Sequence, residues 1–300
     1  MKQLFTRKMR QNFLTGVLFV FALIAAVLFI MPTVLTITNS FMTEKEITVN
    51  YGAMIDNAVN DKKTYISKDL NLKFIPDKVS FSQYITVLFK SPEYLLKFWN
   101  SVILVVPITV FQILLASVTA YGFSRYRGRV REIIFFSYII LMLMPYQVTL
   151  VPNYLVSDWL GILGTRWAII LPGIFSPFSV YLLTKVMRRI PKAYYEAARL
   201  DGASEFQIFW HICLPLTRSA MLSVGLLVFI DYWNMVEQPL ILLKDQEKYP
   251  LSVLLSQINT GDVGLAFAVA VVYMIPALLM FLYGEEYLVE GITYSGGVKG

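Results

Sequence analysis

The chain consists of long apolar runs separated by short polar segments. Five runs contain no Lys, Arg, Asp or Glu, at 11–43, 98–124, 133–157, 167–184 and 263–284. A sixth run of similar length, 220–243, holds Asp231 and Glu237. An α-helix needs about 20 apolar residues to cross a bilayer. The runs therefore predict six membrane spans, at 13–37, 99–123, 133–155, 167–186, 219–243 and 263–284.

Helices are predicted instead of a β-barrel. Barrel strands are about 10 residues long and alternate apolar with polar residues, whereas these runs are longer and apolar throughout. Several spans contain or adjoin proline, which membrane helices tolerate because neighbouring groups satisfy the freed carbonyls. We therefore expect kinked or broken helices near Pro32, Pro107, Pro145, Pro172, Pro177, Pro239 and Pro276.

Composition agrees with a membrane protein. Hydrophobic residues make up 57% of the 300 residues and charged residues only 15%, whereas a soluble domain carries about 25% charged residues. The abundance of large apolar residues also excludes a disordered chain. The prediction is an all-α membrane protein with a single transmembrane domain over 13–300.

Basic residues predict the orientation, because they are enriched in cytoplasmic loops. They gather in the N-terminal tail 1–12, between spans 2 and 3, and in the loop 187–218. Both termini, including the tail 285–300, are therefore expected to be cytoplasmic, and the segment 44–97 to be external. The first run is much longer than the apolar region of a signal peptide and is interpreted as a retained span in a cell membrane.

The sequence contains few groups suited to catalysis. Cys213 and His211 are the only cysteine and histidine, which excludes an internal disulfide and a cysteine metal site. Neither a G-x-S-x-G elbow nor a phosphate-binding loop is present, and there is no basic, aromatic face for nucleic acid. We expect a chain that is not an enzyme, binds no metal or cofactor, and leaves any use of ATP to another subunit.

The loop 187–218 predicts two short helices at the membrane surface. Pro191 is suited to the start of the first helix, and Gly202 can end it in a left-handed conformation. Ser204 or Asp201 can cap a second helix over 205–213, which Pro215 is expected to end. By periodicity alone, this loop is an amphipathic connector with an apolar side of Ile208, Phe209, Ile212 and Leu214.

The order of residues in this loop is more specific. It reads Glu196-Ala197-Ala198, then Gly202 after three residues, then Ile212, Leu214 and Pro215 after nine more. This pattern resembles the EAA loop of ABC importer permeases. Further stretches resemble the sugar-importer branch, nearest to the maltose-type second permease subunit: 74–76, 82–84, Asn100-Ser101, 120–125, Trp233-Asn234, Pro239-Leu240 and 296–300.

The resemblance implies a type I ABC importer permease fold in which the EAA loop forms coupling helices. Glu196 and Asp201 would pair with basic groups of an ATPase, Ala197 and Ala198 would permit close helix approach, and Gly202 would permit the turn. The implied partners are a second permease subunit, an ABC ATPase dimer that binds ATP and Mg, an external solute-binding protein, a carbohydrate and the lipid bilayer.

Two regions depart from the family pattern. The external segment has an extra polar stretch at 51–72, to which we assign no role. Near the C-terminus, Glu285, Glu286 and Glu290 stand where related proteins have more basic residues, and Tyr294-Ser295 replaces small residues. These differences disfavour the contact between the tail and the ATPase dimer that the resemblance to the maltose-type branch implies.

Polar residues within the spans suggest a substrate path. Asp231, Asn234 and Gln238 are predicted to share one face of the span 5 helix, and that face could hydrogen-bond sugar hydroxyls. The alternative is that these residues hold helices together. Phe175 and Ser176, in the broken span 4, are a second predicted part of the lining.

The predicted function is the permease subunit of an ATP-driven carbohydrate importer. One alternative is a permease for a non-sugar solute, such as a glycerol-phosphate-type substrate. Another is an ion-driven secondary transporter, although such proteins often show internal repeats, which we do not find. A membrane scaffold or enzyme is disfavoured by the complete EAA pattern.

Overall fold

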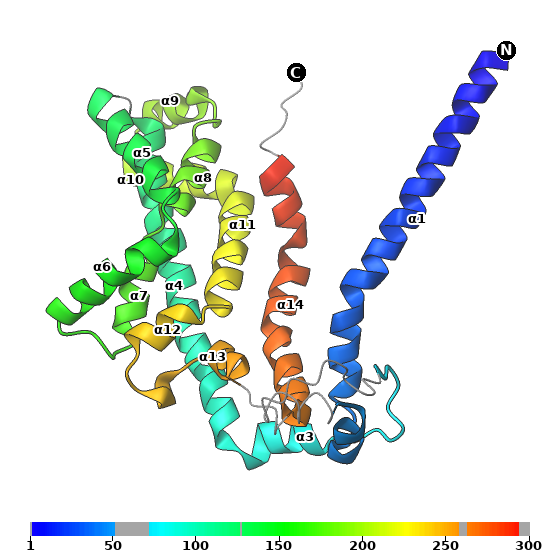
Figure 1. Cartoon of the computed structure of the whole chain (residues 1–300). Coiled ribbons are helices and arrows are strands. Elements are labelled where there is room, and N and C mark those ends of the chain that lie inside the picture. The colour runs from blue at the N-terminus through cyan, green and yellow to red at the C-terminus, as the bar shows by residue number, and fades with distance from the viewer. Residues whose placement is uncertain (1, 52–71, 127, 258–262, 294–300) are drawn as a thin grey trace. The chain divides into compact units, whose positions relative to one another are not determined.

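The computed structural model describes residues 2–51, 72–126, 128–257 and 263–293. These residues form helices and no strand, in agreement with the predicted all-α class (Figure 1). Most of the extra stretch 51–72 and the residues 294–300 lie outside the described part.

The long helices are α1 (Lys2–Asn39), α4 (Pro92–Arg125), α11 (Leu214–Trp233) and α14 (Val263–Thr293). The shorter ones are α3 (Ser82–Ile85), α5 (Arg129–Met142), α6 (Tyr146–Trp159), α7 (Trp167–Gly173), α8 (Pro177–Met187), α9 (Lys192–Leu200), α10 (Glu205–Ile208), α12 (Glu237–Leu242) and α13 (Leu251–Ser256), with π-helical segments η1 (Thr86–Lys90) and η2 (Phe209–Cys213) and the 3₁₀ turn η3 (Gln246–Lys248).

Five helical segments in the described residues are long and apolar enough to cross a membrane: Phe13–Asn39, Pro92–Arg125, Trp167–Met187, Glu205–Trp233 and Gly264–Leu288. A sixth crossing requires α5 and α6 together, which are bent by 104°. The bend lies where Pro145 precedes α6 in an extended conformation, because proline disfavours a helical residue before it and lacks an N–H. The segment predicted as one span at 133–155 is therefore sharply broken.

Span 5 differs from the prediction. The helix that was expected over 219–243 ends at Trp233, and α12 follows after a short break. The predicted break in span 4 is confirmed, because α7 ends at Gly173 and α8 begins at Pro177 with Ser176 as its N-cap. By contrast, Pro32, Pro107 and Pro276 lie inside continuous helices.

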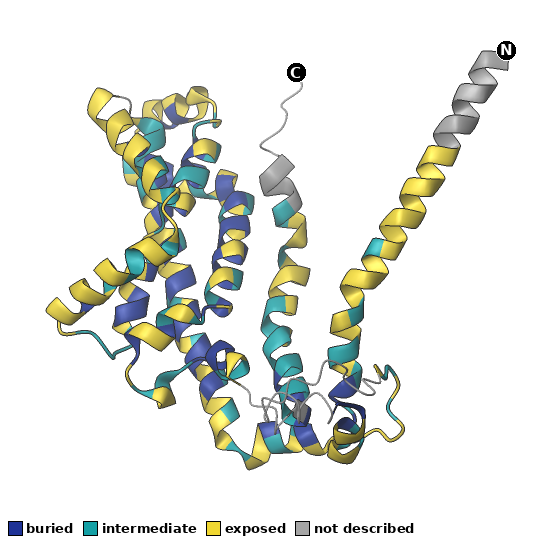
Figure 2. Ribbon diagram, viewed as in Figure 1, coloured by how far each residue is buried: buried dark blue, intermediate teal, exposed yellow. Residues whose placement is uncertain are grey.

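The chain divides into two compact units, and each is described by itself. The first comprises residues up to Pro92 together with 258–272. Its small core contains Met42, Ile47 and Tyr51, against which Phe267 packs. The apolar part of α1 contributes nothing to a core, since no residue in its most apolar window is buried (Figure 2). Its side chains are suited to contact lipid or another subunit.

The second unit comprises 93–257 and 273–300 and holds the main core. Buried residues of α4, α7, α8 and α11 form this core, among them Leu104, Ile108, Leu183 and Trp233. Gly173 permits close packing of α7 on α4, because a Cβ there would lie 3.1 Å from the Ile108 side chain. The predicted EAA loop and the predicted substrate path both belong to this unit.

Candidate functional site

The EAA loop begins with a tight turn between α9 and α10. Gly202 has φ of +83°, the left-handed conformation that the sequence predicted. Ser204 caps α10 in a capping box with Gln207: the Gln207 N–H donates to Ser204 Oγ, and the Ser204 N–H donates to Gln207 Oε1 at 2.8 Å. The turn is therefore held by local backbone and side-chain geometry.

The predicted helix end at Pro215 is wrong. The chain passes from α10 through η2 into α11 without a break, and Pro215 lies in the first turn of α11. A π-helical segment widens the turn and changes the hydrogen-bond register, which accommodates a residue that lacks an N–H. The second half of the EAA loop is thus a direct extension of a membrane-crossing helix.

The EAA positions divide into two faces. Glu196, Ala197, Asp201, Gly202 and Pro215 are exposed. Ala198 is buried, and the partly buried Ile212 and Leu214 pack against the core of this chain. The exposed EAA residues thus form an outward face, whereas Ala198 packs within this chain.

A polar network that the sequence did not predict ties this loop to α4. The Tyr121 hydroxyl donates to Glu205 Oε2 at 2.6 Å. Arg199 pairs with the same carboxylate, through Nε at 2.9 Å and through Nη2. Glu205 therefore joins the end of α4 to both helices of the EAA loop. The resemblance at 120–125 marked this region without indicating its role.

A second contact in the same place joins Arg125 to Tyr195. The guanidinium carbon lies 3.8 Å from the centre of the Tyr195 ring, a distance at which cation–π attraction is effective. Tyr195 is buried, and burial raises the pKa of its phenol above the usual value. Its neutral hydroxyl donates to Cys213 Sγ at 3.8 Å. The lone cysteine is thus a buried structural group of the loop.

A cavity of about 770 Å³ lies between α4, the bent α5–α6 pair, the α7–α8 break and the α11–α12 break. It brings together four of the five residues predicted for the substrate path: Phe175, Ser176, Asp231 and Gln238. Its other polar or aromatic lining residues are Gln112, Tyr146, Thr149, Asn153, Phe178 and Tyr232. Helix breaks at membrane depth are tolerated where they line a cavity, which fits their position here.

Asn234 does not line this cavity. Because α11 ends at Trp233, Asn234 does not continue a helical face from Asp231. Its Nδ2 donates to the Ile230 carbonyl at 2.7 Å, and its Oδ1 accepts from the Tyr273 hydroxyl at 2.8 Å. The alternative that this residue holds helices together is the one that its contacts support.

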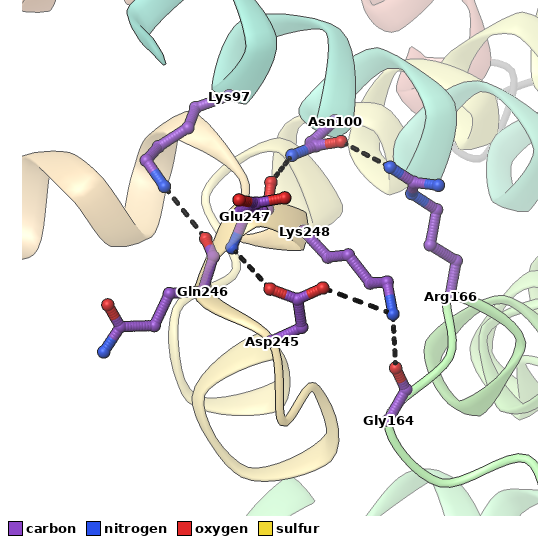
Figure 3. Close-up of polar contacts among 8 residues, drawn as sticks. All are labelled: Lys97, Asn100, Gly164, Arg166, Asp245, Gln246, Glu247 and Lys248. Atoms are coloured by element: carbon purple, nitrogen blue, oxygen red, sulfur yellow. Dashed lines mark hydrogen bonds and ion pairs between the residues drawn. The ribbon is translucent and has the colours of Figure 1, made fainter.

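The opposite end of α4 contributes Lys97, Asn100 and Ser101 to another polar cluster, which also contains Arg166 and which we call the Asn100 clamp. Figure 3 shows Lys97, Asn100 and Arg166. The Asn100 Nδ2 donates to the Glu247 carbonyl at 2.6 Å and to the Tyr249 carbonyl at 3.2 Å. The Asn100 Oδ1 accepts from Arg166 Nη2 at 2.7 Å.

Two other members of the Asn100 clamp, Lys97 and Ser101, hold the same segment, 245–251. Lys97 Nζ donates to the Gln246 carbonyl at 2.9 Å, and Ser101 Oγ accepts from the Leu251 N–H at 2.9 Å. Within this segment, Lys248 Nζ donates to the Gly164 carbonyl at 3.3 Å (Figure 3). Asn100-Ser101 was noted only as a family resemblance, and the fold assigns it this role.

Residues 112–288 match the family described as binding-protein-dependent transport system inner membrane component. The chain therefore belongs to this family of permease subunits and is a multi-pass membrane protein. It is 32% identical over 235 residues to the arabinooligosaccharides transport system permease protein AraQ of Bacillus subtilis (strain 168), which covers 77% of this chain and 83% of AraQ. It is 28% identical over 310 residues to the polygalacturonan/rhamnogalacturonan transport system permease protein YtcP of the same organism, covering 97% and 100%.

The fold is also found in a solved structure. The crystal structure of a bacterial ABC transporter involved in the import of the acidic polysaccharide alginate contains a chain with a TM-score of 0.76. The two are 23% identical, and the match covers 93% of this chain and 98% of the other. The type I ABC importer permease fold is thus shown. A permease subunit of this type is not the ATP-hydrolysing component.

Proposed function

We propose that this chain is one of two permease subunits of an ABC importer for saccharides, and that the 770 Å³ cavity is its part of the translocation path. The cavity carries this proposal. It combines hydroxyl, amide and carboxylate groups, which hydrogen-bond sugar hydroxyls, with Phe175, Phe178 and Tyr232, whose faces suit sugar rings. Named relatives that import oligosaccharides support the substrate class.

The outward face of the EAA loop is proposed to dock on an ABC ATPase dimer. Glu196 and Asp201 are exposed there and offer carboxylates to basic groups of the partner. The exposed Leu200, Phe206 and Trp210 add apolar area beside them. ATP and Mg would be held by the ATPase, and this chain would supply the lever that connects ATP-driven closure to α11.

The proposed orientation places the EAA loop in the cytoplasm and the Asn100 clamp outside. Asn100 and Tyr121 are 21 residues apart on α4, which is about 30 Å along a helix and matches the thickness of the hydrocarbon core. The basic loops favour the cytoplasm on the EAA side. The segment 245–251 would then face the external binding protein, next to the second permease subunit in the cell membrane.

Family membership disfavours the ion-driven transporter. A glycerol-phosphate-type substrate is less well supported than a sugar, because none of the described lining residues of the cavity is a Lys or Arg that could pair with a phosphate.

The test is transport by the complete complex, reconstituted in proteoliposomes with its ATPase and binding protein. We expect saccharide uptake that vanadate abolishes and an uncoupler does not. Gln238→Ala, in the cavity wall, should weaken uptake, whereas Gln147→Ala, whose exposed side chain does not line the cavity, should not. Uptake that is insensitive to vanadate, or equal effects of the two glutamine variants, would contradict the proposal.

A further inference from the structure

The described residues that line the cavity carry very little charge. Asp231 is its single charged lining residue among those that the structure describes, and the remaining polar groups are amides and hydroxyls. Named relatives import both kinds of saccharide: AraQ is named for arabinooligosaccharides, which are neutral, and YtcP for polygalacturonan, which is acidic. The charges that line the cavity therefore bear on which of these two classes, neutral or acidic saccharides, the cavity accepts.

The cavity wall also contains polar atoms without partners. Gln112 is 2% exposed, and its Nε2 donates to Ser179 Oγ at 2.7 Å, while its Oε1 has no hydrogen-bond partner. The Tyr146 hydroxyl, in the same wall, has none either. Buried polar groups are normally satisfied, so two unsatisfied atoms in one wall indicate a place that a hydrogen-bonding ligand completes.

A sugar hydroxyl and a carboxylate differ in how well they can satisfy the unpaired polar atoms of this wall. A sugar hydroxyl both donates and accepts, so it can serve a carbonyl-type oxygen such as Gln112 Oε1 as well as the Tyr146 hydroxyl. An ionised carboxylate only accepts. Where a carboxylate takes the place of that hydroxyl, it would leave the Gln112 oxygen unsatisfied. It would also meet the like charge of Asp231 without a cation among the described lining residues, at membrane depth, where unpaired charge is costly.

We infer that this cavity takes uncharged saccharide segments and excludes uronates, a specificity that rests on the proposed function. The chain would thus serve a neutral oligosaccharide, in contrast to an importer of acidic polysaccharide that shares its fold.

The test compares saccharides that differ only in the carboxylate. The probes are tetragalacturonate and the galactotetraose obtained by reducing its carboxyl groups, with tetramannuronate and the mannotetraose obtained in the same way as a second pair. Saturation-transfer NMR on the complete transporter in nanodiscs, without binding protein, reports contact with the permeases alone. We expect both neutral probes to bind and the uronates to bind more weakly by about tenfold or more, a difference of about 1.4 kcal/mol or more.

Two variants make the cavity less negative by different routes. Asp231→Asn removes the like charge and Asn153→Lys introduces a cation in the cavity wall, so both should narrow the gap between the members of a pair, the second more strongly. Asp158→Asn, on the exposed part of α6 outside the cavity, is the control. It should leave the difference in affinity between the neutral and the acidic saccharide unchanged.

Equal or tighter binding of uronates to the unmodified transporter would overturn the inference, as would binding of neither class. Saccharide uptake with the binding protein then decides separately about the proposed function. If vanadate-sensitive uptake persists, the function stands and only the charge selectivity fails. If uptake is absent as well, both fail.

Discussion

The two ends of α4 hold two loops in different ways. At one end, the Asn100 clamp grips the segment 245–251 mainly through backbone carbonyls and an N–H. At the other end, Tyr121 and Arg125 grip the EAA loop through the side chains of Glu205 and Tyr195. Hydrogen bonds to the backbone of a loop fix its path but leave its side chains free to vary. Contacts to the side chains of a loop require particular residues at those positions.

This difference fits the proposed tasks of the two loops. A segment that faces an external binding protein needs a fixed shape and a surface that can vary with the partner. A loop that transmits motion from an ATPase needs a firm connection to the helices that cross the membrane. Substitutions can test separately the shape of a loop and its connection to the membrane-crossing helices. The largest effect is expected at the turn of the EAA loop.

Gly202→Val should abolish uptake while the protein remains in the membrane. A left-handed conformation costs an L-residue about 1–2 kcal/mol, and a β-branched residue tolerates it poorly, so the turn between α9 and α10 must change. Uptake in proteoliposomes and an immunoblot of membranes measure the two quantities. Gly202→Asn is the control, because asparagine adopts this conformation more readily, and normal uptake by the valine variant would contradict the proposed coupling.

Asn100→Leu should destabilise the protein by about 2–4 kcal/mol, since it leaves the partly buried Arg166 guanidinium and two partly buried carbonyls without their partner. A lower Tm of the complex in nanodiscs would report this loss. Ser101→Ala removes one bond from the same cluster and should cost about 1 kcal/mol. If the two variants melt at the same temperature, Asn100 is not the centre of the clamp.

Tyr121→Phe should lower the amount of solute imported per ATP hydrolysed, with only a small loss of stability. The variant removes a single hydrogen bond to Glu205, about 1 kcal/mol, but that bond connects α4 to the EAA loop. Paired uptake and ATPase assays give the ratio. Tyr126→Phe, at the exposed end of the same segment, should leave it unchanged; an equal decrease in both variants would argue against the connection.

Arg199→Ala should have the smallest effect. Its pair with Glu205 is partly exposed, and exposed ion pairs contribute about 0–1 kcal/mol, less at high salt. Thermal melts in low and high salt should therefore differ little from those of the unmodified protein. A large shift would mean that Arg199, and not Tyr121, makes the main connection.

Local chemistry explains which predictions from the sequence were confirmed. Gly202 adopts the left-handed turn, Ser204 caps the next helix, and Pro172 and Pro177 mark the break in span 4, because these features depend on neighbours in the chain. Pro215 was misjudged because a π-helical turn, supported by packing of Ile208 and Cys213 in the core, carries the helix through it. Asn234 does not share a helical face with Asp231 because α11 ends one residue earlier, where Trp233 and Tyr273 contact each other.

The sequence by itself determined the membrane environment, the approximate spans and the class of transporter, since these depend on the lengths of apolar runs and on residue spacing within one loop. The tertiary structure decided which EAA residues face outward, that Asn100 holds a segment about 150 positions away, and that Phe175, Ser176, Asp231 and Gln238 share a cavity without Asn234. Contacts between distant segments arise from packing, and periodicity within a single helix does not report them.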